Sequence, residues 1–240
     1  MAKHLLIVST STVHGKPYLS YLTDKVKTFF HGKKKIVFLP YARPGGISHS
    51  IYTAKATLFF ENLGFEMKGL HKFNSAAEGI EWADGFFTGG GNTFELTRCL
   101  HELEIIKPLR KAVENGKPYM GTSAGANITG LTISTTNDMP IVYPASFDAL
   151  GFVPFNINPH YLDPDTTSKH MGETRETRIK EFHVFSNQPV VGLREGSALE
   201  VHGDEITLWG ELSARIFEKD QPAYELSTQD DFSFLLNSKI

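Results

Sequence analysis

The sequence has 240 residues, a length that suits one α/β domain, and its 40% hydrophobic content is ample for a buried core. The formal net charge of −3 argues against a nucleic acid or an anionic membrane as a partner. No apolar run reaches the roughly 18 residues of a membrane-spanning helix, and the single cysteine excludes an internal disulfide. We therefore expect one domain over residues 1–240, located in the cytoplasm, where thiols stay reduced.

Short apolar runs alternate with helical patterns in the first half of the chain. The apolar runs predict strands at residues 4–9, 36–41, 65–70, 85–88 and just before Ser123. Apolar residues at helical spacing predict helices from about residue 17 to 32 and over 50–63, 93–100 and 104–115. This alternation indicates a mostly parallel central sheet with helices on both faces. In such a sheet, the loops at the carboxyl ends of the strands form the site.

The pattern changes after Gly130. A polar loop spans residues 135–140, an extended run covers 152–157, and the charges of 172–185 have helical spacing. Another apolar strand is predicted at 190–193. The three short runs that follow predict a small C-terminal antiparallel meander over 198–202, 206–209 and 214–217.

A Gly-x-Ser-x-Gly pattern at residues 121–125 follows the fifth predicted strand. A serine in this pattern lies on a sharp turn from strand to helix, which forces its hydroxyl outward. The flanking glycines avoid clashes with the neighbouring strand or helix. The next backbone N–H, that of Ala124, is free at a helix N-terminus and can meet a developing negative charge. The pattern therefore makes Ser123 a candidate nucleophile. The alternative is that it is an ordinary turn rich in Gly and Ser, with no catalytic role.

A serine nucleophile needs a base, and the base needs a carboxylate that orients it. His160 is the candidate base because Asn158-Pro159 fixes the backbone before it, whereas the other histidines suit surface or core positions. Asp138 and Glu195 are both candidates for the carboxylate. One could orient His160 while the other binds a positive charge of the substrate. Alternatively, Asp138 only caps a turn and Glu195 only pairs with its neighbour in solvent.

Two further patterns contain residues of the types that bind metals or act as nucleophiles. His160 begins His-x-x-Asp-x-Asp with Asp163 and Asp165, but this ligand set matches metal spacing poorly, so we expect no metal. Cys99 lies in a helix-like run, which predicts a buried structural thiol rather than a nucleophile.

Three glycines and Asn92 follow the strand at 85–88. Asn92 with Glu95 three residues later is typical of a helix capping box. The glycines are better explained if a backbone N–H approaches a ligand, and the Lys-Ser/Thr of a phosphate-binding loop is missing. We therefore predict that the N–H groups of Gly91 and Ala124 form an oxyanion hole, with Gly90 and Asn92 also at the substrate.

Alternating charges mark residues 172–179. By default this is a solvated helix face with intrahelical ion pairs. Because the segment follows His160 closely, it could instead present Arg175 or Arg178 to a substrate carboxylate, for which an arginine fork is well suited.

Six blocks in order resemble the S51 family of serine peptidases, and within it the peptidase E group of α-aspartyl dipeptidases. The blocks are residues 89–94, 123–127, 135–142, 147–150, 157–160 and 172–179. The resemblance covers most of the chain and implies an α/β fold akin to class I glutamine amidotransferase domains. It implies Ser123 as nucleophile and His160 as base, and leaves the acid open between Asp138 and Glu195. Thr122 departs from members that carry Trp before the serine.

The function that this resemblance implies is hydrolysis of Asp-X dipeptides through an acyl-enzyme on Ser123, without a cofactor. Arg175 is our hypothesis for binding the aspartyl side chain. The alternatives are a cyanophycinase-like β-aspartyl peptidase and a non-catalytic small-molecule-binding protein on the same fold. We expect a small-molecule substrate, no nucleic acid or membrane partner, and a monomer or small homo-oligomer.

Overall fold

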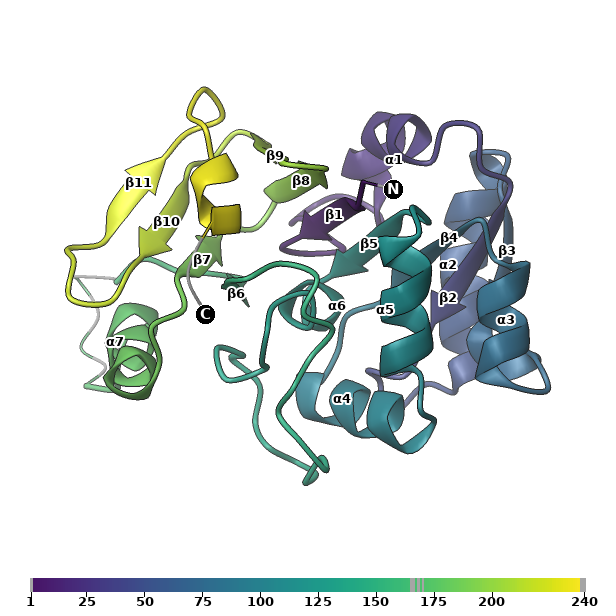
Figure 1. Cartoon of the computed structure of the whole chain (residues 1–240), viewed down its shortest axis with the longest axis horizontal. Coiled ribbons are helices and arrows are strands. Elements are labelled where there is room, and N and C mark those ends of the chain that lie inside the picture. The colour runs from purple at the N-terminus through teal and green to yellow at the C-terminus, as the bar shows by residue number, and fades with distance from the viewer. Residues whose placement is uncertain (1, 165–166, 168, 170, 238–240) are drawn as a thin grey trace.

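Two β-sheets organise the chain, as Figure 1 shows. The computed structural model describes residues 2–164, 167, 169 and 171–237. Within this part of the chain, a seven-stranded sheet has the order β3-β2-β4-β5-β1-β8-β9, and a four-stranded sheet has the order β11-β10-β7-β6.

The first five strands form the parallel part of the larger sheet. They are β1 (His4–Val8), β2 (Lys35–Leu39), β3 (Glu66–Gly69), β4 (Gly85–Thr88) and β5 (Tyr119–Thr122). Strands β4 and β5 are buried at every position, as expected for strands covered on both faces, whereas the edge strand β3 alternates exposed and buried residues. The predicted mostly parallel sheet is confirmed.

Helices cover both faces of this sheet. They are α1 (Thr23–Phe29), α2 (His49–Asn62), α3 (Ala76–Trp82), α4 (Thr93–Glu102), α5 (Ile106–Glu114) and α6 (Ala124–Asn127), with 3-10 turns at Ser20–Leu22, Leu70–Lys72 and Ser233–Asn237. Leu6 and Val8 of β1 share a core cluster with residues of α1 and α2, while Leu5 and Ile7 share one with residues of α3, α4 and α5. In Figure 1, α3 and α5 lie in front of the sheet and α2 behind it. Alternate side chains of one strand thus enter opposite layers.

The predicted C-terminal antiparallel meander is confirmed for its first two strands and wrong for the third, because the run 214–217 pairs with other strands of the second sheet. Strands β8 (Ala198–His202) and β9 (Glu205–Trp209) form a hairpin that extends the larger sheet, because β8 pairs antiparallel with β1. Pairing with β8 covers what would otherwise be an open edge of the parallel sheet at β1.

The remaining strands build the second sheet. Strand β10 (Ala214–Phe217) pairs with β11 (Tyr224–Leu226) and with β7 (Val190–Leu193), and β7 is parallel to β6 (Asn156–Pro159). The extended run predicted at 152–157 becomes a strand only from Asn156, since Phe152, Val153 and Phe155 are buried in the core without strand pairing. Helix α7 (Arg175–Phe185) lies beside this sheet in Figure 1.

No helix in the described part of the chain is long and apolar enough to cross a membrane. Cys99 on α4 is buried, as predicted, and burial together with nearby Glu95 raises the pKa of its thiol to about 12. A thiol with this pKa is protonated at neutral pH and is a poor nucleophile.

Glu200 on β8 connects three elements of the larger sheet. Its Oε1 lies 2.8 Å from His4 Nε2 on β1, and its Oε2 accepts a hydrogen bond from Lys25 on α1. The hydrogen bond with His4 lowers the pKa of this carboxyl, burial opposes it, and the contact with Lys25 lowers it further, to about 2. The carboxylate therefore stays ionised in the folded chain at pH values where it would be protonated in the unfolded chain.

We predict that Glu200→Gln lowers the free energy of unfolding at neutral pH and that its difference from the wild type shrinks in acid. The stabilisation is fully present above the ordinary pKa near 4.5 and is lost as the pH falls toward 2. Urea unfolding at a series of pH values between 2 and 7 measures it. Glu205→Gln, at an exposed position of β9, serves as the control. A Glu200→Gln difference that stays constant over the whole pH range would contradict the prediction.

Candidate active site

Ser123 lies at the turn between β5 and α6. Its φ of 54° and ψ of −112° lie outside the usual regions for a residue with a side chain, as expected for a strained strand-to-helix turn. A Cβ atom on Gly121 would lie 2.1 Å from the carbonyl oxygen of Gly125, and one on Gly125 would lie 2.4 Å from that of Thr88. The predicted steric reason for both glycines is confirmed.

His160 lies between Ser123 and Glu195. Its Nε2 lies 3.0 Å from Ser123 Oγ, and its Nδ1 lies 2.7 Å from Glu195 Oε1. Because an ionised carboxylate can only accept, Nδ1 carries the hydrogen in this contact and Nε2 is left to accept from the serine hydroxyl. The side chains of His160 and Glu195 are 34% and 48% exposed, so solvent and a substrate can reach the pair.

A buried serine fixes the backbone of His160. Ser9, at the end of β1, is fully buried, and its hydroxyl accepts from the N–H of His160 at 2.9 Å and donates to the carbonyl of Leu193 at 2.8 Å. His160 has a φ of 53°, a conformation that a histidine keeps only when its surroundings hold it. Ser9 thus connects the end of β1 to the ends of β6 and β7. The only sequence signal for this role of Ser9 was its position directly after a predicted buried strand.

Asp138 does not contact the His160 ring, whose two nitrogens are occupied by Ser123 and Glu195. Instead, Asp138 Oδ2 accepts from the N–H and the hydroxyl of Thr93, at 2.7 and 2.6 Å, and from the Thr136 hydroxyl at 3.2 Å. It therefore lies at the N-terminus of α4, where a carboxylate is stabilised by the helix dipole. The structure brings Glu195 to the histidine and Asp138 to the start of α4.

The loop of residues 89–92, here called the glycine loop, packs against Ser123. A Cβ on Gly90 would lie 2.8 Å from Ser123 Cβ, and one on Gly91, whose φ is +147°, would lie 2.1 Å from the Ala42 carbonyl oxygen. The Gly90 carbonyl accepts from Arg43 Nε at 3.1 Å and from the Tyr52 hydroxyl at 3.0 Å. Since C=O and N–H point in opposite directions across a trans peptide, these bonds also orient the N–H of Gly91.

Arg43 and Tyr52 could not be identified from the sequence, because both come from the β2–α2 region and act on a backbone atom. Within the described chain, the N–H groups of Gly91 and Ala124 have no hydrogen-bond partner, so both are available to an incoming oxygen.

Asn92 has structural partners of its own. Its Oδ1 accepts from Glu95 N–H at 3.1 Å, which confirms that it caps α4, and its Nδ2 donates to the Met139 carbonyl at 2.9 Å. The second contact of a capping box, from the Asn92 N–H to the Glu95 carboxylate, was expected but is not formed. The Asn92 N–H donates to the Ala42 carbonyl, and the Glu95 carboxylate pairs with Arg98. The side chain of Asn92 is therefore a support of the loop, which does not favour its predicted contact with substrate.

Arg175 is the first residue of α7 and is half-buried. Among the described residues it has no hydrogen bond or ion pair. Burial and the nearby charge of Arg178 lower the pKa of its guanidinium, and the negative charge of Asp138 opposes this shift. Arg178, the alternative, is exposed and lies 3.9 Å from Glu173. An unpaired, partly desolvated arginine in the field of a carboxylate is suited to bind a ligand that carries one negative and one positive charge.

The members of the alternative metal pattern have other partners. The His160 ring contacts Ser123 and Glu195, and the Asp163 carboxylate accepts from Arg194. Asp165 lies outside the described residues. The described part of the chain contains no group of three or more side chains placed to hold a metal ion.

Comparison with known proteins points to one family. The sequence profile of Peptidase family S51 matches residues 5–209. The chain is 42% identical over 238 residues to the probable alpha-aspartyl dipeptidase of Drosophila melanogaster, covering 98% of both chains. It is 45% identical over 234 residues to peptidase E of Streptomyces coelicolor, covering 98% of this chain and 95% of the relative. The crystal structure of a peptidase from an acI-B1 actinobacterium matches at a TM-score of 0.70 and 19% identity, with 98% of both chains covered, which shows the same fold.

We predict that Gly91→Ala slows covalent labelling of Ser123 by a fluorophosphonate probe by on the order of 10²-fold, the cost of one lost oxyanion donor. The new methyl group would have to displace the loop from Ala42. Gly45→Ala is the matched control, because nothing lies within 4 Å of the position of its Cβ. Equal labelling rates in the two variants would show that the loop does not serve the serine.

Proposed function

The chain belongs to peptidase family S51, and from this premise we propose that it is a serine-type dipeptidase that hydrolyses dipeptides with an N-terminal L-aspartate. The observation that carries the proposal is the row of contacts from Ser123 Oγ through His160 to Glu195, at 3.0 and 2.7 Å. This row has the geometry of a nucleophile, a base and an orienting carboxylate. The name of the Drosophila relative, a probable alpha-aspartyl dipeptidase, supplies the substrate class.

The reaction proceeds in two stages. His160 Nε2 takes the proton of Ser123 as Oγ attacks the carbonyl carbon of the aspartyl residue, and Glu195 stabilises the resulting imidazolium. The oxyanion is stabilised by the N–H groups of Gly91 and Ala124. His160 then gives its proton to the leaving amine, and the C–N bond breaks to form an acyl-enzyme. A water molecule, deprotonated by His160, repeats the attack and releases aspartate.

Recognition of the aspartyl residue requires one cation and one anion. Arg175 binds the side-chain carboxylate, since its guanidinium has no partner among the described residues and lies near Asp138. Asp138 accepts from the free α-amino group, because its described hydrogen bonds all use Oδ2 and leave Oδ1 available. Buried groups that need a charged partner discriminate strongly against uncharged analogues, since those would leave them unpaired.

We also propose that residues 1–240 act as one peptidase domain, as a monomer or small homo-oligomer without nucleic acid partners. The free thiol of Cys99 supports a cytoplasmic location.

We predict that the wild type hydrolyses Asp-Leu and that Ser123→Ala abolishes both hydrolysis and labelling by a fluorophosphonate probe. Asn-Leu should be a poor substrate, because the amide leaves Arg175 without its ionic partner. Release of leucine, measured by chromatography, follows each reaction. Cleavage of β-Asp-Arg without cleavage of Asp-Leu would instead indicate a cyanophycinase-like peptidase, and labelling without turnover of either would indicate a different substrate class.

The two carboxylates should differ in the kinetic constant that they affect. Glu195→Gln should lower kcat for Asp-Leu by on the order of 10²–10⁴, because the base loses its orienting group. Asp138→Asn should mainly raise KM, by about tenfold or more, because it loses the charge that binds the amine while an oxygen remains to cap α4. Steady-state kinetics of both variants measure this, and a larger loss of kcat in Asp138→Asn would reverse the assignment.

A further inference from the structure

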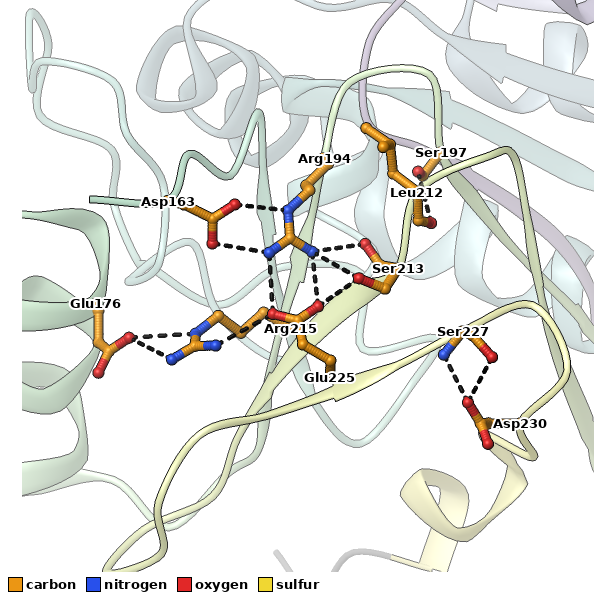
Figure 2. Close-up of polar contacts among 10 residues, drawn as sticks. All are labelled: Asp163, Glu176, Arg194, Ser197, Leu212, Ser213, Arg215, Glu225, Ser227 and Asp230. Atoms are coloured by element: carbon orange, nitrogen blue, oxygen red, sulfur yellow. Dashed lines mark hydrogen bonds and ion pairs between the residues drawn. The ribbon is translucent and has the colours of Figure 1, made fainter. Parts of the chain in front are cut away.

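The guanidinium of Arg194 is the centre of an ion-pair network outside the row of Ser123, His160 and Glu195 (Figure 2). It forms a fork with Asp163, from Nε to Oδ2 at 2.9 Å and from Nη2 to Oδ1 at 2.8 Å. A second fork joins it to Glu225, from Nη1 to Oε2 at 2.8 Å and from Nη2 to Oε1 at 2.9 Å. Nη1 also donates to the Ser213 carbonyl at 2.8 Å. All three nitrogens of the side chain are therefore committed.

The first fork joins the two segments that carry the base and its carboxylate. Arg194 directly precedes Glu195, and Asp163 lies in the segment that follows His160. Tyr161, between His160 and Asp163 in the chain, is buried, with 1% of it exposed. Its N–H donates to the Leu193 carbonyl at 2.9 Å, and its ring centroid lies 5.5 Å from the guanidinium carbon of Arg194. The guanidinium thus closes over Tyr161 and holds the end of β6 against the end of β7.

The second fork leads to helix α7. Glu225 on β11 also accepts from Arg215 Nη1 on β10 at 3.1 Å, and Arg215 Nη2 donates to Glu176 at 2.9 Å. Glu176 follows Arg175 in the first turn of α7 and pairs with Lys180 one turn later, at 2.9 Å. Figure 2 shows the continuous path from Asp163 through Arg194, Glu225 and Arg215 to Glu176.

The network is charge-balanced, and its central arginine is shielded from solvent. Three cations, those of Lys180, Arg194 and Arg215, meet three anions, those of Asp163, Glu176 and Glu225. The Arg194 side chain is only 14% exposed. Burial raises the pKa of Glu225, but hydrogen bonds from Arg194, Ser213 and Arg215 bring it down to about 2, so it is ionised at neutral pH. Isolated surface pairs contribute little, whereas bidentate pairs in a network hold geometry.

We propose that Arg194 is a positioning residue with two separate effects: through Asp163 it holds His160 beside Glu195, and through Glu225 and Arg215 it holds the first turn of α7, and with it Arg175, at the aspartyl side chain. The second effect rests on the proposed function, whereas the first concerns the reactivity of Ser123 alone. A lysine cannot replace Arg194, because an ammonium group cannot form two planar forks at once.

The two effects are separable by variants that each cut one side of the network. Asp163→Ala removes the first fork at a side chain that is 55% exposed, and Arg215→Met removes the link to Glu176 while keeping an aliphatic stem. Arg194→Met and Arg194→Lys cut both. Arg110→Met is the control, because Arg110 on α5 is likewise an arginine held by several hydrogen bonds, to the carbonyls of Ala149 and Leu150, but takes no part in the network.

Each variant is characterised by two measurements. The first is the rate at which a fluorophosphonate labels Ser123, and the second is steady-state kinetics, which give kcat and KM for Asp-Leu. Asp163→Ala should lower labelling and kcat by about tenfold with KM within twofold, since a small displacement of a catalytic group is costly. Arg215→Met should raise KM by about tenfold with labelling within twofold. Both Arg194 variants should show both effects, and the Arg110 control neither.

A merely structural network would give a different pattern. If Asp163→Ala and Arg215→Met lower the melting temperature but change labelling and KM in parallel, or change neither at temperatures where they are folded, the proposal is overturned. If the wild type does not cleave Asp-Leu, the proposed function fails and the α7 effect fails with it. The labelling rate of Asp163→Ala against the control then still decides the His160 effect.

Discussion

The candidate site depends on the seam where the two sheets meet. Ser123 comes from the end of β5 in the larger sheet, whereas His160 and Glu195 follow β6 and β7 in the smaller one. Ser9 follows β1 of the larger sheet, and its buried hydroxyl bonds across this seam to the smaller sheet, through the His160 N–H and the Leu193 carbonyl. Because a buried hydroxyl without partners is costly, these two bonds fix the relation between the sheets and thereby the distance from nucleophile to base.

Strained backbone occurs on both sides of this seam. Ser123 and His160, the two residues that would exchange a proton, both have positive φ, and Gly91 beside them has a conformation that side chains rarely allow. Such conformations persist only when the surrounding packing holds them. Here Ser9 holds His160, while Tyr52 and other donors hold the glycine loop from its carbonyl side. The rigid sheet edges therefore supply the free energy that keeps the reactive groups in place.

Charges are treated in two opposite ways around the site. In the network of Arg194, every cation has an anion and the geometry is closed. At the start of α7, by contrast, Arg175 has no ionic partner among the described residues, although the charge of Asp138 acts on the pKa of its guanidinium. Groups that only support the structure are paired with one another, and groups that would meet a charged ligand are kept apart. Whether a charged side chain has an ionic partner in the protein therefore distinguishes the supporting side chains from those proposed to bind substrate, although both groups contain arginines and acidic residues.

The sequence by itself determined the parallel sheet, the turn at Ser123, the cap at Asn92 and the choice of His160 as the candidate base, because each depends on residues close together in the chain. It could not decide between Asp138 and Glu195, nor find Ser9 or Arg194. Those choices depend on which strand ends become neighbours in space. The pairing of β8 with β1 joins residues from opposite ends of the chain, such as His4 and His202, and the pairing of β7 with β6 brings Leu193 beside Pro159. Only the packed tertiary structure fixes these pairings.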